Sequence, residues 1–398
     1  MLFTDAQRAL QAFLAPLTLD EFLDRTLSGG LARVEAVSAA GRSLLLGPDP
    51  RAVLGGAFEL APKLTFHSAN ALGPAPSLEG VRDAADFRER IAQFHARNYS
   101  VRFPELRALS PQLDRLARAF EVVLHQPVTT SAFWSTGGMR APVHYDDHDL
   151  IVVQLLGGKR WHVANSSELP NTWRGIPPER VELGPHTSFD VGPGDLVYLP
   201  RGTLHSVDSD GESVHVSIGF TPLTVREALI AAIDQLSDVD QALRVTAGGR
   251  LAHHLRGVGL ERLAGPVLDG IERLRTACRA PGFLAAALQR RSSRIVATLA
   301  PLPAATAPQT LDLDSELMQS EVAFCHLTAN PDKIDFSYPG GHLYIHRGAE
   351  QALLYMVNTP RFRLREVPGE VGDEVRLSLA ARLVEIGFLR PVPDPPSG

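Results

Sequence analysis

Short apolar runs separated by Gly and Pro fill the middle of this 398-residue chain and limit the folds open to it. The runs cover residues 128–134, 150–156, 160–164, 187–191, 195–199 and 213–220. Runs of this length, bounded by turn residues, are typical of β-strands, and a series of them indicates an antiparallel sandwich or barrel. The last run alternates apolar and polar side chains, so one of its faces is expected to meet a core.

Helical patterns flank this region on both sides. Apolar residues at helical spacing predict helices at 83–98 and 111–124, and again at 225–236, 238–246, 259–278 and 282–290. Short helices are expected within 4–28, with Thr18 or Asp20 as a cap. A Pro- and Ala-rich linker at 300–310 precedes a last part with a possible strand at 362–366 and a helix near 376–387.

The chain is therefore predicted to be an α+β protein of more than one domain. Its length exceeds that of one ordinary core, and two or three domains are the natural expectation. The predicted divisions are residues 1–222, 223–298 and 311–390.

Composition excludes several classes of protein. The net charge of -6 gives no basic footprint, so direct binding to nucleic acid is not expected, whereas a basic polypeptide partner would suit an acidic surface. No apolar run approaches the ~20 residues that span a bilayer, so no membrane association is expected. The N-terminus does not resemble a signal peptide. Two cysteines, Cys278 and Cys325, lack metal or disulfide spacing and predict a cytoplasmic location.

A candidate metal site combines two separate stretches of the chain. His144 and Asp146 stand two residues apart just before the run 150–156, so in a strand both side chains project from one face. His205 follows the run 195–199 at the end of another strand-like segment. Two imidazoles and one carboxylate with open positions opposite are the ligand set of non-haem Fe(II) oxygenases. The sequence predicts such a site.

Other interpretations of these residues stay open. His144 and Asp146 could form an exposed hydrogen-bonded pair, with His205 an ordinary loop residue. Asp147, His148 and Asp149 are rival ligands by proximity. In a regular strand Asp147 points away from the site, and His148 is expected beside the site rather than on the metal. His162 and His215 are expected to be structural histidines of the β region.

Lys159 is the next candidate, because it follows a Gly-Gly turn and begins the run that contains Trp161. A buried ammonium needs an anion, and a dicarboxylate cosubstrate that chelates iron would offer its far carboxylate. The alternative is a solvent-exposed turn lysine beside Arg160. With the metal motif present, we expect Lys159 to point inward and Arg160 to point outward.

Several motifs in order resemble one family. The stretches HYDDHDLIVVQLLGGKRW (144–161), GDLVYLPRGTLH (194–205) and SVHVSIGF (213–220) resemble the JmjC-type, cupin-4 ribosomal oxygenases. The resemblance is dense across 105–221 and looser beyond. It implies a double-stranded β-helix that uses Fe(II), 2-oxoglutarate and O2. It also implies a helical dimerisation region over 223–298 and a winged-helix-like domain over 311–390.

The resemblance also assigns roles by position. The implied iron ligands are His144, Asp146 and His205. Lys159 would bind the C5 carboxylate of the cosubstrate. Where relatives often carry an Asn and a Tyr that touch the cosubstrate, this sequence has Ser131 and Phe133. Phe133 lacks the hydroxyl, so Ser131 is one substitute and Ser217 is a further polar candidate in the barrel interior.

The activity implied is hydroxylation of a residue in a polypeptide, with a ribosomal protein favoured as substrate and a homodimer as the assembly. 2-Oxoglutarate would yield succinate and CO2. A hydroxylase of a small molecule or peptide natural product would use the same site. A non-catalytic binding protein on the same fold would form no succinate. A metal-dependent cupin isomerase or hydrolase would not need Lys159 placed for a dicarboxylate.

Overall fold

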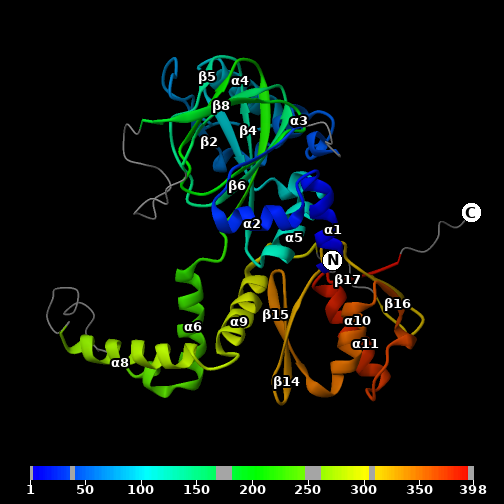
Figure 1. Cartoon of the computed structure of the whole chain (residues 1–398). Helices are drawn as coiled ribbons and strands as arrows, with labels where there is room; N and C mark the ends of the chain where they lie inside the picture. The colour runs from blue at the N-terminus through cyan, green and yellow to red at the C-terminus, as the bar shows by residue number, and fades with distance from the viewer. Residues whose placement is uncertain (1–2, 36–40, 167–181, 247–260, 304–309, 393–398) are drawn as a thin grey trace, which may run out of the picture. The chain divides into compact units, whose positions relative to one another are not determined.

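The computed structural model describes residues 3–35, 41–166, 182–246, 261–303 and 310–392. Internal contacts divide the chain into two compact units, Met1–Pro222 and Leu223–Gly398. In Figure 1 the first unit runs from blue to green and the second from green to red. Each unit is described by itself.

Two antiparallel sheets form the body of the first unit. The larger sheet has the strand order β1-β9-β6-β11-β4-β3-β2, and the smaller has the order β5-β10-β7-β8. The short runs predicted an antiparallel sandwich or barrel, and the structure has two antiparallel sheets. The strands of the larger sheet are β1 (Ala32–Val34), β2 (Thr65–His67), β3 (Ser100–Pro104), β4 (Val128–Ser135), β6 (Asp149–Leu156), β9 (Leu196–Leu199) and β11 (Ser213–Phe220). Those of the smaller are β5 (Met139–Arg140), β7 (Lys159–Ala164), β8 (His186–Val191) and β10 (His205–Ser209).

The strand β6 is buried along both of its faces, which explains its unbroken apolar sequence. Its residues Leu150 and Val152 pack with Trp161 of the smaller sheet in one apolar cluster between the sheets. On the opposite face of the larger sheet, Phe22 makes edge-on contact with Tyr198 at 5.3 Å between ring centroids. The larger sheet is therefore held from both sides.

Five α-helices accompany these sheets in the described part of the first unit. They are α1 (Phe3–Leu14), α2 (Leu19–Ser28), α3 (Pro50–Gly56), α4 (Ala84–His95) and α5 (Pro111–Leu124). Thr18 caps α2 as expected, because its hydroxyl accepts from the Glu21 amide while the Glu21 carboxylate accepts from the Thr18 amide. Gly29 ends the helix in a left-handed conformation, with φ of 72°.

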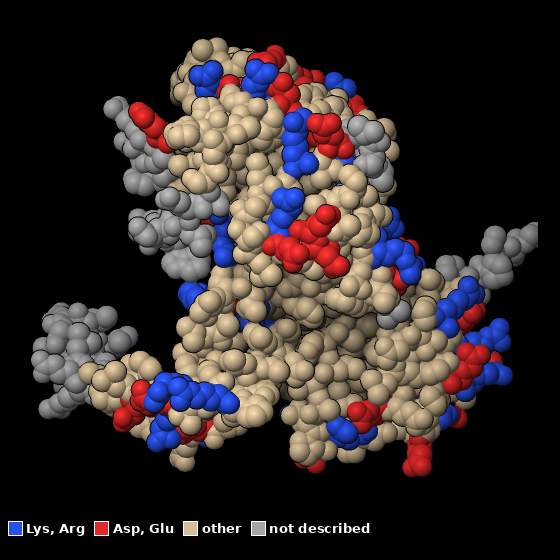
Figure 2. Space-filling model, viewed as in Figure 1, with Lys and Arg blue, Asp and Glu red and all other residues tan. Residues whose placement is uncertain are grey.

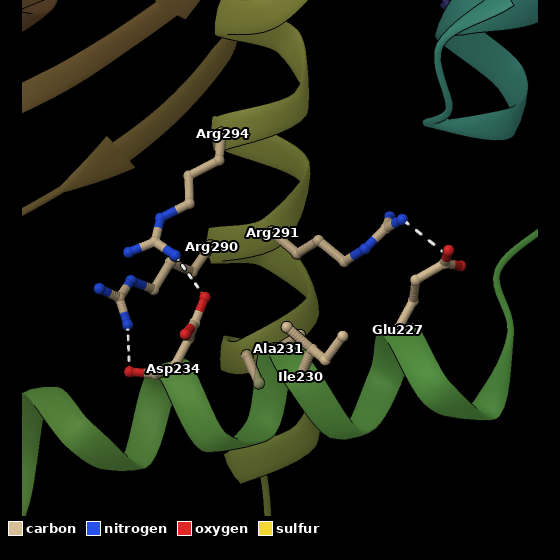
Figure 3. Close-up of a pocket in the computed structure, with 8 residues that line it drawn as sticks. Glu227, Ile230, Ala231, Asp234, Arg290, Arg291 and Arg294 are labelled. Carbon is tan, nitrogen blue, oxygen red and sulfur yellow. Dashed lines mark hydrogen bonds and ion pairs between the residues drawn. The ribbon is translucent and has the colours of Figure 1, made fainter. Parts of the chain in front are cut away.

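The second unit begins with helices. They are α6 (Val225–Val239), α8 (Glu261–Cys278) and α9 (Phe283–Thr298). The helix expected at 238–246 is instead a single 3-10 turn, Gln241–Arg244. Ion pairs and hydrogen bonds join α6 to α9: Arg294 pairs with the Asp234 carboxylate and Arg290 donates to the Asp234 carbonyl oxygen (Figure 3).

Two small sheets and two α-helices complete the described part of this unit. One sheet has the order β16-β12-β17 and the other β13-β14-β15. The elements are β12 (Glu316–Gln319), β13 (His326–Ala329), β14 (Lys333–Tyr338), β15 (Gly341–His346), α10 (Glu350–Asn358), β16 (Arg361–Arg363), α11 (Asp373–Glu385) and β17 (Leu389–Pro391). The strand expected over 362–366 ends at Arg363 and a 3-10 turn, Leu364–Glu366, follows.

Charged side chains of both signs lie on the surface of the described residues (Figure 2). On the face drawn in Figure 2, basic and acidic side chains are interspersed over the described residues and are not gathered by sign. Among the helices that the structure describes, none combines the length and apolar character needed to cross a bilayer.

Candidate metal centre

The three candidate metal ligands converge. His144 and His205 form an isolated antiparallel bridge, in which each backbone amide donates to the other residue's carbonyl oxygen, at 3.0 and 2.8 Å. One ligand atom from each of His144, Asp146 and His205 lies within 4.8 Å of the others. A carboxylate oxygen of Asp146 is 3.8 Å from Nε2 of His205. This set has the ligand types of a two-histidine, one-carboxylate metal site.

The segment that carries His144 and Asp146 differs from its expected conformation. It was expected to be a regular strand, but β6 begins only at Asp149, and His144 joins the sheet through its single bridge to His205. His144 and Asp146 both line the cavity described below, whereas Tyr145 between them is buried elsewhere. The alternation of side chains therefore survives without a continuous ladder.

Backbone carbonyl groups orient both imidazoles. Nδ1 of His144 lies 2.8 Å from the Pro142 carbonyl oxygen, and Nδ1 of His205 lies 3.0 Å from that of Thr203. A proton on each Nδ1 donates to these oxygens and leaves the Nε2 lone pair free for a metal. Burial, followed by the nearby His144, lowers the pKa of His205 to about 4. His205 is therefore neutral near pH 7, which is the form that binds metals.

Asp149, a rival ligand in the sequence, has a different task. Its carboxylate accepts a hydrogen bond from the Tyr198 hydroxyl at 2.5 Å and another from the Arg201 amide at 3.2 Å. Burial raises the pKa of this carboxyl group. These bonds fix the start of β6 against the turn that precedes His205. His148 lines the cavity beside the cluster and bonds to Asp147, so neither belongs to the set of converging ligand atoms.

Replacing Tyr198 by Phe tests this support. The change removes a hydrogen bond to a buried carboxylate, so we expect the free energy of unfolding to fall by about 1.5–3 kcal/mol. Urea denaturation measures the loss. The matched control is Tyr99→Phe, because the Tyr99 hydroxyl donates to the Gly73 carbonyl oxygen at an exposed site. Equal losses in the two variants would contradict the supporting role of Asp149.

A cavity of about 370 Å³ opens beside the candidate ligands. Strands β2, β3, β4 and β11 of the larger sheet and β7 and β10 of the smaller contribute to its walls. Apolar side chains such as Phe133 and Trp161 supply part of the lining, and the Trp161 ring lies 5.6 Å from that of His205. The cavity is large enough for a small organic acid together with part of a second molecule.

Lys159 lies at one wall of this cavity and is only 3% exposed. Its Nζ donates to the Ser135 hydroxyl at 3.1 Å and to Nδ1 of His215 at 2.9 Å. Burial lowers the pKa of Lys159 to about 7, and that of His215 falls well below its usual range because of burial and the adjacent ammonium. Arg160, the next residue, is exposed and pairs with Asp190 at 2.7 Å.

The surroundings of Lys159 suit an incoming anion. Both of its hydrogen-bond partners are neutral, and no carboxylate among the described residues forms an ion pair with it. A buried ammonium without a counter-charge is costly, and a bound carboxylate would relieve that cost. The chemistry of the residues therefore fits both a ferrous ion at the three ligands and a dicarboxylate between that ion and Lys159.

Ser131 and Ser217 face each other in the register of β4 and β11, and both are buried in the cavity wall. Phe133 stacks on His215 at 4.8 Å between ring centroids. Sequence reasoning missed the two partners of Lys159, Ser135 and His215. Alternation along the two strands was the available signal, since Ser135 shares a face with Ser131 and His215 shares one with Ser217.

Comparisons with known proteins agree with this geometry. Residues 106–228 match the family model described as JmjC domain. Ribosomal oxygenase 2 of Rattus norvegicus is 27% identical over 139 residues, which are 34% of this chain and 30% of that protein. The bifunctional lysine-specific demethylase and histidyl-hydroxylase NO66 of Drosophila persimilis is 26% identical over 227 residues, 53% of this chain and 31% of that protein. The matches thus span about a third of these relatives.

Solved structures share the fold over nearly the whole chain. The structure of YcfD, a ribosomal oxygenase from Escherichia coli, in complex with cobalt and 2-oxoglutarate has a TM-score of 0.52 and 15% identity. That likeness covers 95% of this chain and 99% of the other. The family resemblance expected from the motifs is confirmed. Residues 106–228 match a JmjC domain, the described part of the chain shares the α+β JmjC/cupin fold of these structures, and its sequence is distantly similar to the ribosomal oxygenases.

Proposed function

We propose that this protein is an Fe(II)- and 2-oxoglutarate-dependent oxygenase that hydroxylates an amino-acid residue in a protein or peptide. The observation that carries the proposal is the pairing of two features in one cavity. Three candidate metal ligands converge, and the same cavity is lined by the buried Lys159, which forms no ion pair with a carboxylate of the described residues. Either feature alone could be purely structural. Together they are what a dicarboxylate that chelates a metal ion would require.

Each residue has a task in the proposed site. His144, Asp146 and His205 would hold the iron. Lys159 would bind the far carboxylate of 2-oxoglutarate, with Ser131 and Ser217 as further polar contacts. With 2-oxoglutarate and O2, the bound iron supplies the oxidising power for C–H hydroxylation, and succinate and CO2 are the coproducts.

Other residues of the cavity would position the ligands and the cosubstrate. The backbone bridge between His144 and His205 holds two ligands in register before any metal arrives. The ammonium of Lys159 orients the cosubstrate, because a single buried charge at the far wall admits one end of a dicarboxylate. The apolar side chains of Trp161 and Phe133 line the same cavity, where they would disfavour water beside the bound cosubstrate.

A ribosomal protein is the favoured substrate. The names of relatives support this choice, since one is called ribosomal oxygenase 2 and YcfD is called a ribosomal oxygenase. The described surface also lacks a strong excess of basic charge on the face of Figure 2, as suits a protein rather than a bare nucleic acid partner. A small molecule or peptide natural product is the second candidate.

Two measurements test the proposed function. The purified protein should form succinate from 2-oxoglutarate only when Fe(II) and O2 are present, and no succinate would favour a non-catalytic binding protein. Mass spectrometry should then find a ribosomal protein that is lighter by one oxygen atom in a strain without the gene. Identical ribosomal proteins in both strains, with succinate formation intact, would move the assignment to a small-molecule or natural-product hydroxylase.

We extend the proposal to the parts of the chain. Residues 1–222 would form the catalytic domain, 223–298 a dimerisation region and 311–390 a winged-helix-like domain that contacts protein. Exposed apolar side chains on α6 and α8 support a homodimer, because exposed apolar surface is common at protein interfaces. Six of them are between 42% and 62% exposed: Leu229, Ile230, Ile233, Val267, Leu268 and Ile271.

Polar substitutions on α6 test the dimer. The double variant Leu229→Gln, Ile233→Gln is expected to shift the protein from dimer to monomer at micromolar concentration, because it removes apolar surface from the interface. Light scattering coupled to size-exclusion chromatography measures the mass. Leu354→Gln is the control, since Leu354 is a similarly exposed apolar residue on α10. A monomeric wild-type protein, or a double variant that stays dimeric, would remove the assignment.

A further inference from the structure

A second cation lines the cavity on its β2–β3 side. Arg102 lies on β3, where its register partners are Phe133 on β4 and Thr65 on β2. Its neighbours along the strand, Val101 and Phe103, are fully buried and do not line the cavity. Arg102 therefore faces the cavity by strand alternation. Among the described residues that line the cavity, Arg102 and Lys159 are the two with basic side chains other than histidine.

Arg102 and Lys159 sit in different surroundings. Lys159 is bonded to Ser135 and His215, whereas the guanidinium of Arg102 makes no hydrogen bond or ion pair with the described residues. The carboxylate that stabilises its charge is Asp146, which offsets part of the desolvation that lowers the pKa of Arg102. Asp146 is also a proposed metal ligand. Metal binding would therefore leave Arg102 without a counter-charge.

The charges of the loaded site leave room for one more anion. The divalent ion and the two basic side chains carry four positive charges, whereas Asp146 and 2-oxoglutarate carry three negative ones. Histidines that hold a metal ion are neutral, and burial lowers the pKa of both His67 and His215. One positive charge remains. It belongs to Arg102, because the carboxylate at Lys159 is already supplied by the cosubstrate.

We propose that Arg102 selects the substrate by binding a carboxylate of it, either an acidic side chain or a free acid. A guanidinium can bind a carboxylate through two parallel hydrogen bonds, which fixes orientation as well as charge. A lysine or arginine of the substrate at the same point meets repulsion in a partly desolvated cavity. This inference rests on the proposed function and narrows its substrate class to molecules that present an anion near the metal.

The experiment uses binding rather than turnover. The full-length protein is loaded with Mn2+ and excess 2-oxoglutarate without oxygen, and the probes are acetyl-Gly-Gly-Xaa-Gly-Gly-amide peptides with Glu, Gln or Lys at Xaa. Paramagnetic relaxation of the peptide protons reports binding close to the metal. We expect the Glu peptide to bind at least about tenfold more tightly than the Lys peptide, as one ion pair in a partly desolvated site implies.

Variants at position 102 separate this role from others. Arg102→Gln should remove the preference for Glu, Arg102→Glu should invert it, and Arg102→Lys should retain part of it. The matched control is Arg140→Gln, because Arg140 is exposed, pairs with Asp208 and does not line the cavity. It should keep the full preference.

Several outcomes would overturn the inference. One is that the wild-type protein binds all three peptides equally or binds none of them detectably. Another is that Arg102→Gln still prefers the Glu peptide. A tenfold loss of 2-oxoglutarate affinity in Arg102→Gln, with the order of the peptides unchanged, would assign Arg102 to the cosubstrate instead. Failure of the wild-type protein to bind Mn2+ and 2-oxoglutarate would reject the proposed function itself, which the other outcomes leave standing.

Discussion

His205→Ala is expected to abolish tight Fe(II) binding and to lower 2-oxoglutarate turnover by more than about 100-fold, the upper end of losses for residues that merely support metal ligands. The reason is geometric. His205 is buried, its Nδ1 is committed to the Thr203 carbonyl oxygen, and its Nε2 is the atom left to meet the metal. His144→Ala and Asp146→Ala should have the same effect. Succinate formation and metal content after dialysis are the measurements.

A histidine outside the cavity supplies the control for this series. His162 bonds to Ser188 at 2.7 Å and to Asp208 at 3.2 Å, and it does not line the cavity. His162→Ala should therefore keep its metal and its turnover. The unfolding of each metal-free variant should be compared with that of the metal-free wild type, which separates ligand loss from misfolding. A correctly folded His205→Ala protein with normal turnover would refute the metal site.

Lys159→Met should raise the dissociation constant of 2-oxoglutarate about 30- to 150-fold, which corresponds to the loss of about 2–3 kcal/mol from a charge-assisted hydrogen bond. The variant keeps the aliphatic stem and removes the ammonium. Metal binding should be unchanged, since Lys159 is not among the converging ligand atoms. Calorimetric titration of 2-oxoglutarate into the Mn2+-loaded protein measures the effect. An unchanged dissociation constant would contradict the role of Lys159.

The same substitution should stabilise the protein without ligand. Burial holds the pKa of Lys159 near 7, below its usual value of 10.5, so between these values the unfolded chain binds more protons than the folded one. Wild-type stability should therefore rise with pH across this window, by at most about 1.4 kcal/mol per pH unit from this group. Below pH 7 the folded protein carries the full free-energy cost of burying the charged Lys159 ammonium.

Urea denaturation at pH 7, 8 and 9 checks this sign. Lys159→Met should be more stable than the wild type at pH 7, and the difference should shrink as the pH rises. Lys63→Met is the control, because Lys63 is an exposed lysine that pairs with Glu105. The prediction fails if Lys159→Met is less stable than the wild type at pH 7, or if its stability rises with pH as steeply as that of the wild type. Either result would show that burying the ammonium does not destabilise the fold.

Strands whose pattern is visible in a short stretch of sequence could be predicted. The six apolar runs correspond to β4, β6, β7, β8, β9 and β11, because alternation and Gly-Pro turns are local signals. Strands β1, β2 and β3 escaped prediction, since they are short and form only by pairing with distant partners, as β1 does with β9. The helix predicted over 111–124 from apolar residues at helical spacing has these same bounds in the structure, where Ser110 caps it and Pro111 begins it.

Some residues of the candidate site could be predicted from the sequence and others could not. His144, Asp146, His205 and the inward direction of Lys159 could be predicted, because residue type and spacing carry them. Arg102 could not, since it belongs to a strand with no recognised pattern. Alternation could have placed His215 on the face of Ser217, but not its contact with Lys159, because 56 residues separate the two and only the folded sheets bring them together.

The reciprocal amide bonds between the two histidine segments have a consequence for metal exchange. Folding alone already draws these segments together, so the conformational entropy of assembling the ligands is spent before the ion arrives. Chelation should then empty the pocket while leaving the scaffold intact, and a fresh ion should restore it without refolding. A preformed site of this kind should also bind other divalent ions. The metal found in the protein would then depend on which ions are available in the cell.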